Sequence, residues 1–300
     1  MTASPGGGPW DHPGVRVGPV SAQRIRLLSD HLTGAALVTI AVLAGVLLVL
    51  PTLVVILASF TSTSYLSFPP AGLSLRWYAR LLASDEILRA ARTSLIVAML
   101  ATAGALGLGV LTAFPLVRGR FRGRDAVLAF TLAPIMLPSI VLGIALLFFF
   151  GFLGIRLSLS TLVVSHILIT FPYVVRTSAA ALLQVDAVLE EAAANLGATP
   201  WQTLRHVTLP LLTPGLAVGA GFAFIESFDN LALSIFVAGQ RQETLPMRLF
   251  QLLVSDIDPV VAAVSATLIA ASFVVLFAVY RLAGFGQFMR VIGERRAQLP

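Results

Sequence analysis

The chain has 300 residues, of which 57% are hydrophobic and only 11% are charged, whereas soluble globular domains carry about 25% charged residues. The mean hydropathy of +0.92 therefore indicates a protein that folds in a lipid bilayer, and it excludes an ordinary water-soluble domain. The net charge is +6, all 20 basic residues are Arg, and Cys is absent, which excludes disulfides, thiolate nucleophiles and Cys-based metal sites.

Six stretches are apolar enough, and long enough or nearly so, to cross a bilayer as helices, which takes about 20 residues each. They are residues 33–60, 94–117, 127–153, 160–175, 211–236 and 259–282. The fourth stretch is short and can extend to residue 183, and polar residues interrupt the fifth. We therefore predict an all-α membrane protein with six transmembrane helices within residues 33–285. A polar, Gly/Pro-rich and disordered tail is expected over residues 1–32, and a second tail over residues 286–300.

Most of the arginines fall on the cytoplasmic side if both ends of the chain are cytoplasmic, as is usual for short loops of membrane proteins. The basic loop of residues 118–124 has Phe121 as its one aromatic residue, which indicates contact with lipid headgroups and not with nucleic acid. The segment 73–91 resembles a helix on the membrane surface, with Trp77 and Tyr78 at the level of the headgroups; an ordinary connecting loop is the alternative.

Small residues and prolines indicate that these stretches pack together as a bundle. Small residues predict close contact between helices: Ala103, Gly104, Gly107 and Gly109 in the second stretch, and Gly215 and Gly219 in the fifth. The third stretch contains two prolines, which free backbone carbonyls that then need partners. A lone His166 in the fourth stretch is expected to form a hydrogen bond between helices.

The longest loop, residues 176–210, is predicted to form two helices separated by a glycine. Residues 184–196 place apolar side chains on one stripe of a helix. Gly197 is predicted to end this helix in the left-handed conformation, which glycine adopts without steric cost. Residues 199–202, Thr-Pro-Trp-Gln, have the pattern of a capping box with proline at the first helical position. This second helix is expected to stop before Pro210.

The loop carries a motif that consists of Glu191-Ala192-Ala193, Gly197 and Val207-x-Leu209-Pro210. It resembles the EAA loop of ABC importer permeases, with Val207 where that family usually has Ile. The resemblance implies the ABC type I importer permease fold, in which this loop is a coupling helix that fits a cleft of a separate ATPase subunit. Glu191 would pair with a basic residue of the ATPase, and Gly197 would set the angle between the two helices. The ATPase-coupling residues implied in this way are Glu190, Glu191, Ala192, Ala193, Gly197, Leu209 and Pro210.

Two further stretches, from Ser67 to Tyr78 and from Phe228 to Ser265, resemble the spermidine/putrescine-type subfamily of these permeases. The resemblance implies import of a small solute such as spermidine or putrescine, delivered by an extracytoplasmic substrate-binding protein. It also implies an ATPase dimer and a second, related permease as partners, in a bacterial inner membrane. The same patterns occur in related importers for iron, thiamine or phosphonate, which are therefore the alternative cargoes.

Glu226 and Asp229 interrupt the fifth apolar stretch. A carboxylate at the centre of a transmembrane helix costs about 2.5–3.5 kcal/mol, so it normally faces a cavity or a partner. The i, i+3 spacing places both on one face, beside Asn230, where they would attract an amine-bearing cation and repel an anion. The alternative is that they lie in the outer interface or pair with Arg241 or Arg248. The candidates for the cargo pathway are Glu226, Asp229, Asn230, Tyr173 and Phe228.

Several catalytic signatures are missing from the sequence. The chain has no Lys and no GxxxxGK[ST] motif, so it lacks the P-loop that binds ATP. No catalytic motif and no paired metal-ligand motif is present, so we expect neither a catalytic residue nor a metal site. We therefore expect a transport subunit that is not an enzyme and holds no cofactor, with ATP and Mg bound by the partner ATPase. A secondary transporter or channel without an ATPase is the alternative from another class, and the loop at residues 184–210 weighs against it.

Overall fold

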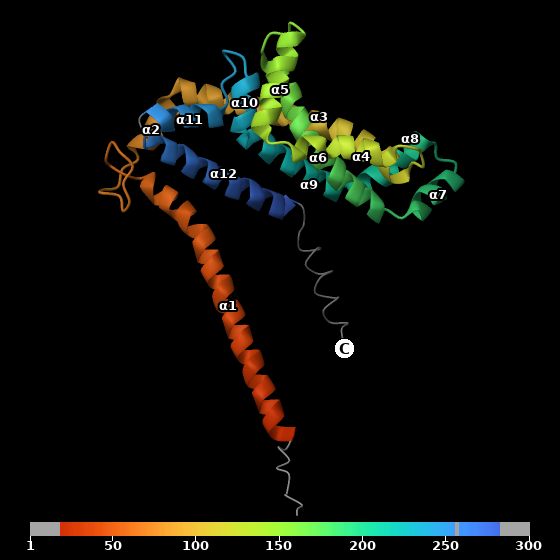
Figure 1. Ribbon diagram of the computed structural model, residues 1–300, viewed down its shortest axis with the longest axis horizontal. Coiled ribbons are helices and arrows are strands. Elements are labelled where there is room, and N and C mark those ends of the chain that lie inside the picture. The colour runs from red at the N-terminus through yellow and green to blue at the C-terminus, as the bar shows by residue number, and fades with distance from the viewer. Residues whose placement is uncertain (1–18, 256–257, 283–300) are drawn as a thin grey trace, which may run out of the picture. The chain divides into compact units, whose positions relative to one another are not determined.

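The computed structural model describes residues 19–255 and 258–282, so the predicted C-terminal tail and the first part of the N-terminal tail lie outside the described residues. The described part is helical, and its one β-type pairing is an isolated bridge between Thr61 and Leu73. Figure 1 shows the helices, of which η1 is a π-helix. They are α1 (Pro19–Ala58), α2 (Arg76–Ala83), α3 (Asp85–Arg118), α4 (Arg124–Met136), α5 (Ser139–Phe152), α6 (Leu159–Gln184), α7 (Ala187–Asn195), α8 (Pro200–Thr203), η1 (Leu204–Thr208), α9 (Leu209–Asp229), α10 (Leu231–Val237), α11 (Leu245–Ser255) and α12 (Val260–Leu282).

Helix α1 is described by itself, because the chain divides after Leu57 into two compact units. The helix begins at Pro19, so the second part of the segment that was expected to be a disordered tail is helical. Its apolar part, Ala36–Ala58, is long enough to cross a membrane, in agreement with the first predicted span.

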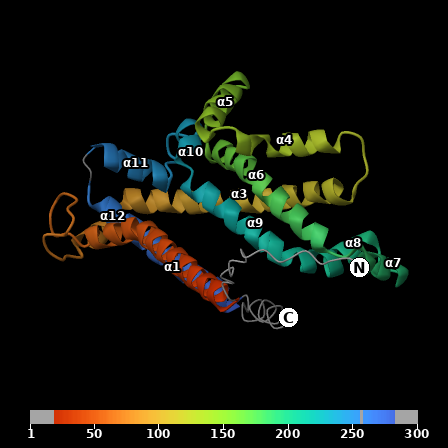
Figure 2. The same ribbon diagram turned by 60° about the horizontal axis from the view of Figure 1, so that its bottom comes forward.

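The second unit is built around α3, α6 and α9, which pack against one another (Figure 2). Glycines allow this close approach. A Cβ on Gly109 of α3 would lie 2.6 Å from Cγ1 of Val174 in α6, and a Cβ on Gly219 of α9 would collide with the hydroxyl of Thr177 in α6. The helix packing predicted from small residues is therefore confirmed at these positions, but not at Gly107, where a Cβ would meet no atom within 4 Å.

A buried histidine joins three helices of this unit. His166 of α6 is 0% exposed. Its Nδ1 lies 2.9 Å from the hydroxyl oxygen of Ser227 in α9, and its Nε2 lies 3.0 Å from that of Ser234 in α10. Both ring nitrogens therefore have partners, as a buried imidazole requires. The predicted hydrogen bond between helices is confirmed, and His166 forms two such bonds.

The third predicted span is not one continuous helix. Helices α4 and α5 meet at an angle of 105°, with Leu137 and Pro138 between them. Pro138 has no N–H to donate, and it disfavours a helical conformation at the preceding residue. Leu137 accordingly has extended backbone angles, with φ −92° and ψ 137°. The prolines of this stretch were expected to free backbone carbonyls, and in the structure the helix is broken at Leu137 and Pro138.

The fifth predicted span is also divided, because α9 ends at Asp229 and α10 begins at Leu231. Asn230 lies between them, and its Oδ1 accepts a hydrogen bond of 2.9 Å from the N–H of Leu233, which caps α10. Among the described residues, four helices are long and apolar enough to cross a membrane, and the α4–α5 pair makes a fifth if it is one broken span. The sixth predicted stretch is helical as α12, but its apolar part, Val260–Val274, is shorter than a span.

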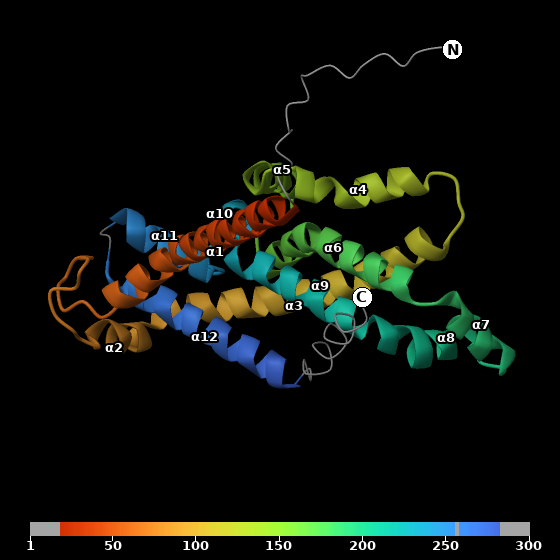
Figure 3. The ribbon, with the colours of Figure 1, turned by 90° about the horizontal axis from the view of Figure 1, so that it is seen from below.

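The two ends of the α3–α6–α9 bundle carry different elements: α2 and α11 lie at one end, and α7 and α8 at the other (Figure 3). At the first end, Trp77 of α2 is only 5% exposed and packs with Leu81, Ile87, Leu245 and Val260. The predicted helix is present as α2, and its position at the membrane surface stays a prediction, although Trp77 faces the protein interior. Its indole N–H donates to the carbonyl of Thr61 at 2.9 Å, which satisfies its polar atom inside the protein.

Candidate functional site

The α7–α8 helix pair has the local structure that its sequence predicts. Asp186 caps α7 by accepting a hydrogen bond of 3.0 Å from the N–H of Val188. Gly197 has φ +87°, a left-handed conformation that residues with a Cβ rarely adopt. Thr199 and Gln202 form the predicted capping box at the start of α8. The chain therefore turns sharply between two short helices at one glycine.

The second helix of the pair does not stop before Pro210, as the sequence suggested. Helix α8 continues through η1 directly into α9, and residues Pro200–Asp229 form one helical rod. A proline inside a helix clashes with the carbonyl four residues earlier, here that of His206. The π-turn over Leu204–Thr208 covers this position, and the wider turn allows the helix to continue through Pro210. The pair is therefore joined to a spanning helix without a flexible loop.

The outer surface of the helix pair is exposed and partly apolar. Leu196 is 90% exposed, and Val188 and Trp201 are also exposed. The carboxylate of Glu191 is exposed too, and no hydrogen bond or ion pair of it is found within residues 19–255 and 258–282. Such a surface has the composition of an amphipathic helix that binds in a groove of another protein.

Glu190, in contrast, is held inside the chain. One of its carboxylate oxygens accepts a hydrogen bond of 2.9 Å from the hydroxyl of Thr208 in η1. The other lies 3.5 Å from Nε of Arg118 at the end of α3. The two adjacent glutamates therefore differ: Glu190 bonds within the chain, whereas Glu191 is open to a partner. Sequence patterns alone could not separate them, because the partners of Glu190 lie in distant segments.

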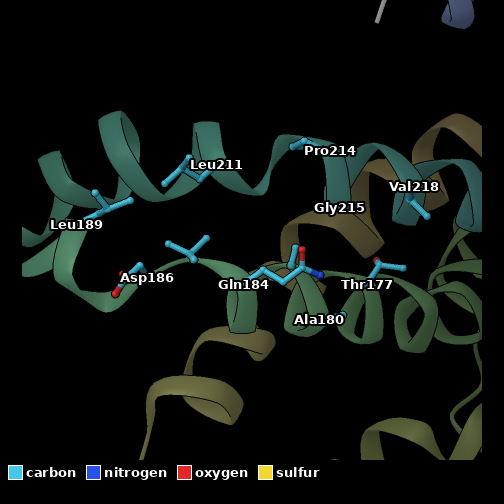
Figure 4. A pocket seen from close by; sticks show the side chains of 11 residues that line it. Thr177, Ala180, Gln184, Asp186, Leu189, Leu211, Pro214, Gly215 and Val218 are labelled. Carbon is cyan, nitrogen blue, oxygen red and sulfur yellow. The ribbon is translucent and has the colours of Figure 1, made fainter. Parts of the chain in front are cut away.

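A groove of about 590 Å³ runs between α6, α9 and the start of α7 (Figure 4). Its lining is mostly apolar, with a few polar side chains that include Gln184 and Thr177 of α6. It is lined by Thr177, Ala180, Ala181, Gln184, Val185, Asp186, Leu189, Leu211, Pro214, Gly215 and Val218. The groove therefore begins where the helix pair joins the bundle and follows the contact of α6 with α9.

Three of the candidate pathway residues come together further along α6 and α9. The hydroxyl of Tyr173 donates to one oxygen of Glu226 at 3.4 Å, and the amide of Asn230 donates to the other at 3.1 Å. The ring of Tyr173 stacks on that of Phe222, with 6.4 Å between their centroids. Phe222 was missed in the sequence, although it lies one helical turn before Glu226. We name Tyr173, Phe222, Glu226 and Asn230 the α6–α9 polar cluster.

The other two pathway candidates lie elsewhere. Asp229 is exposed, and no partner for its carboxylate is found in the part of the chain that the structure describes. Phe228 stacks on Phe224 and packs against the apolar cluster around Trp77. Neither contributes to the α6–α9 polar cluster. The suggested pairing with Arg248 is not seen, because Arg248 forms an ion pair with Glu86.

The described residues contain no group of three or more His, Asp or Glu side chains that could hold a metal ion. Two groups of polar side chains join helices of the bundle: His166 with its two serine partners, and the α6–α9 polar cluster.

Comparison with known proteins identifies the class. Residues 105–284 match the family described as "Binding-protein-dependent transport system inner membrane component", and the chain belongs to this family. It is therefore a permease component of an ABC importer, a multi-pass protein of the inner membrane. Over 231 residues it is 36% identical to the spermidine/putrescine transport system permease protein PotC of Escherichia coli (strain K12), which covers 77% of this chain and 87% of PotC.

A second curated relative and a solved structure agree with this assignment. The putrescine transport system permease protein PotI of Escherichia coli (strain K12) is 31% identical over 268 residues, which covers 87% of this chain and 95% of PotI. A bacterial ABC transporter involved in the import of alginate has a chain with a TM-score of 0.63 at 16% identity, which covers 85% of this chain and 96% of that one. This last similarity supports the fold, and the relatives confirm the family that the loop motif indicated.

Proposed function

We propose that this chain is the permease subunit of an ATP-driven importer of polyamines such as spermidine and putrescine. In this proposal it works with a separate ATPase dimer, which binds ATP and Mg, a second related permease and an extracytoplasmic substrate-binding protein. The observation that carries the proposal is the exposed α7–α8 helix pair, which is joined without a flexible loop to α9. We place this pair and both ends of the chain in the cytoplasm.

The helix pair supplies the contact with the ATPase. Leu196 and Trp201 present apolar area that water would otherwise surround, and Glu191 adds a charge without a partner in the described chain. A groove with apolar walls and a basic residue would complement this surface. Movement of the pair would reach the membrane directly, since α8, η1 and α9 form one rod. A secondary transporter or channel would have no use for such a surface.

The α6–α9 polar cluster supplies the contact with the cargo. No ion pair of Glu226 is found among the residues that the structure describes, although it lies in a helix that can cross the membrane. An uncompensated carboxylate at such a position marks a pathway for a cation. The stacked rings of Tyr173 and Phe222 lie beside it, and aromatic faces attract ammonium groups. The combination suits an aliphatic amine.

The cluster and the groove share one side of α9. Val218, Phe222 and Glu226 follow one another at intervals of four residues along α9 and therefore lie on one side of this helix, and Asn230 follows directly after its last residue. Val218 lines the groove and lies about 12 Å from Glu226 at 1.5 Å per residue. We infer that a polyamine passes from the cluster along this face to the groove, and that the groove opens towards the cytoplasm.

Two observations bear on the choice of cargo. The curated relatives PotC and PotI carry polyamine names, and the cluster attracts cations. A phosphonate would be repelled by Glu226, and iron would need more ligands than one carboxylate. Thiamine is the strongest competitor, because it is a cation with aromatic rings that could stack on Tyr173.

A reconstituted complex tests the cargo assignment. The chain is assembled in liposomes with its ATPase, second permease and binding protein, and ATP hydrolysis is measured with spermidine, putrescine, thiamine, iron and a phosphonate. We expect stimulation by the polyamines. Stimulation by thiamine or a phosphonate, without any by polyamines, would contradict the polyamine assignment and leave the permease assignment intact.

A variant series tests the role of the cluster. Glu226→Gln should lower polyamine uptake by about 10- to 100-fold, because hydrogen bonds to charged groups contribute about 1.5–3 kcal/mol. Asp229→Asn tests the second candidate and should change uptake much less. Asp125→Asn, an exposed carboxylate of α4, is the matched control and should have no effect. Equal uptake by Glu226→Gln and the control would refute the role of Glu226.

A further inference from the structure

The Glu190 carboxylate uses its two oxygens for two different segments. Oε1 accepts from the hydroxyl of Thr208, and Oε2 faces the guanidinium of Arg118. Thr208 belongs to η1, which leads into α9, whereas Arg118 is the last residue of α3. One side chain of α7 therefore contacts both of the long helices that flank α6.

The guanidinium of Arg118 also contacts the backbone that leads into α7. Its Nη2 donates to the backbone carbonyl of Val185 at 2.9 Å, just before α7 begins. Val185 and Glu190 lie on either side of the start of α7, so Arg118 contacts the helix at its base and along its first turns. Both charged side chains are half-buried, with 33% of Arg118 and 23% of Glu190 exposed.

The hydroxyl of Thr208 lies at an unusual place in the helical rod. Thr208 is 1% exposed and is the last residue of the π-turn η1. Single π-turns in α-helices occur often at functional sites. The bond from Thr208 to Glu190 therefore ties α7 to the point at which the α8–η1–α9 rod departs from regular helix geometry.

Helix α3 extends from this region to the opposite end of the bundle. Near its other end, the hydroxyl of Ser94 accepts a buried hydrogen bond of 2.8 Å from the N–H of Leu245 in α11. A displacement of Arg118 along the axis of α3 would thus reach α11, where no residue of the helix pair makes contact directly. The connection is mechanical, since α3 is a continuous helix of 34 residues.

We propose that Glu190, Arg118 and Thr208 form a clamp that transmits movement of the α7–α8 pair to α3 and α9 together. The inference rests on the proposed function, because it assumes that an ATPase moves the pair. It assigns different roles to two adjacent glutamates. Glu191 binds the ATPase subunit, whereas Glu190 is a positioning residue that couples movement of the α7–α8 pair to α3 and α9. Without the clamp, the ATPase would still bind and hydrolyse ATP, but α3 would not follow.

The test uses the complete reconstituted complex and measures three quantities: the amount of ATPase that co-purifies, the rate of ATP hydrolysis, and the number of cargo molecules imported per ATP. Glu190→Gln removes the negative charge and Thr208→Val removes the hydroxyl, both with little change in side-chain size, whereas Arg118→Gln removes the guanidinium and shortens the side chain. We expect normal co-purification, ATP hydrolysis within twofold of wild type, and at least a fivefold fall in cargo imported per ATP. The effect of the double variant Glu190→Gln/Arg118→Gln should be smaller than the sum of the two single effects, because each single variant already breaks the Glu190–Arg118 ion pair.

Two control variants carry the same substitutions as Arg118→Gln and Thr208→Val, but at residues outside the clamp. Arg122→Gln removes an exposed arginine in the next loop, and Thr213→Val removes a hydroxyl that bonds only within α9, to the carbonyl of Leu209. Both should import cargo at the wild-type ratio. Clamp variants that also keep this ratio would overturn the proposal.

Two further outcomes separate the clamp from the proposed function. If the ATPase no longer co-purifies with Glu190→Gln, which is the result expected for a variant at Glu191, then Glu190 binds the ATPase and the clamp is overturned. If the wild-type chain itself captures no ATPase, the proposed function fails. Should Glu190→Gln not accumulate as folded protein, Thr208→Val provides the same ratio measurement, since it leaves the ion pair in place.

Discussion

The contact of α3 with α6 allows a quantitative prediction, because two glycines of one helix differ in what surrounds them. A Cβ on Gly109 would lie 2.6 Å from Cγ1 and 2.8 Å from Cβ of Val174, and 3.3 Å from the backbone nitrogen of Val175. A Cβ on Gly107 would meet no atom within 4 Å. Val174 is fully buried and branched at Cβ, so it cannot rotate away easily. Gly109→Ala therefore requires α3 and α6 to move apart, whereas Gly107→Ala does not.

The magnitude follows from a comparison of the two variants. Both gain the same helix propensity, about 0.8–1.0 kcal/mol in favour of alanine, and this contribution cancels in their difference. Forcing an extra carbon into a packed interface costs about 1–3 kcal/mol. We therefore expect Gly109→Ala to be less stable than Gly107→Ala by about 1–3 kcal/mol, which is roughly a 5- to 150-fold difference in the folding equilibrium constant.

The measurement is the free energy of unfolding of each purified variant in mixed detergent micelles, with loss of helix followed by circular dichroism. Wild-type protein provides the reference for the gain expected from Gly107→Ala. If the two variants are equally stable within about 0.5 kcal/mol, the close approach of α3 to α6 at Gly109 is refuted.

Three further predictions test single elements of the structure. His166→Leu should lower the free energy of unfolding, and its combination with Ser227→Ala should give a coupling energy of about 0.6–1.7 kcal/mol in a double-mutant cycle, the range for hydrogen bonds between membrane helices; additive effects would refute the bond. Trp77→Phe should cost about 1–3 kcal/mol in thermal unfolding, because the carbonyl of Thr61 loses its buried donor; unchanged stability would mean that water replaces the indole. Gly197→Asp should abolish uptake while membrane insertion, measured by fractionation, stays intact, since φ +87° strains a residue with a Cβ; normal uptake would show that the turn tolerates strain.

The sequence predicted those features that depend on neighbouring residues. Apolar stretches predicted spanning helices, since a helix in lipid needs a continuous run of such residues. The turn at Gly197 and the capping box at Thr199 were predicted correctly, because each depends on a few adjacent side chains. The same holds for the close packing at Gly109 and Gly219, where a missing Cβ is itself the signal.

Features that depend on distant residues could not be predicted. The break between α4 and α5 and the continuation of the helix through Pro210 show that a proline can end a helix or be absorbed, depending on what packs around it. The burial of Trp77 depends on α11 and α12, which follow much later in the chain. The partners of Glu190 and the stacking of Tyr173 on Phe222 likewise join segments whose proximity no local pattern reveals.

The central claim is that the α7–α8 pair binds a separate ATP-hydrolysing subunit, and crosslinking from that pair tests it most directly. A photoreactive amino acid at Leu196, which is 90% exposed, is compared with one at Phe152, which is 89% exposed at the end of α5. The account predicts that the Leu196 position captures the ATPase subunit in intact membranes, with a yield that changes when ATP is added, and that the Phe152 position does not. Absence of the ATPase from the Leu196 products, or equal capture from both positions, would contradict it.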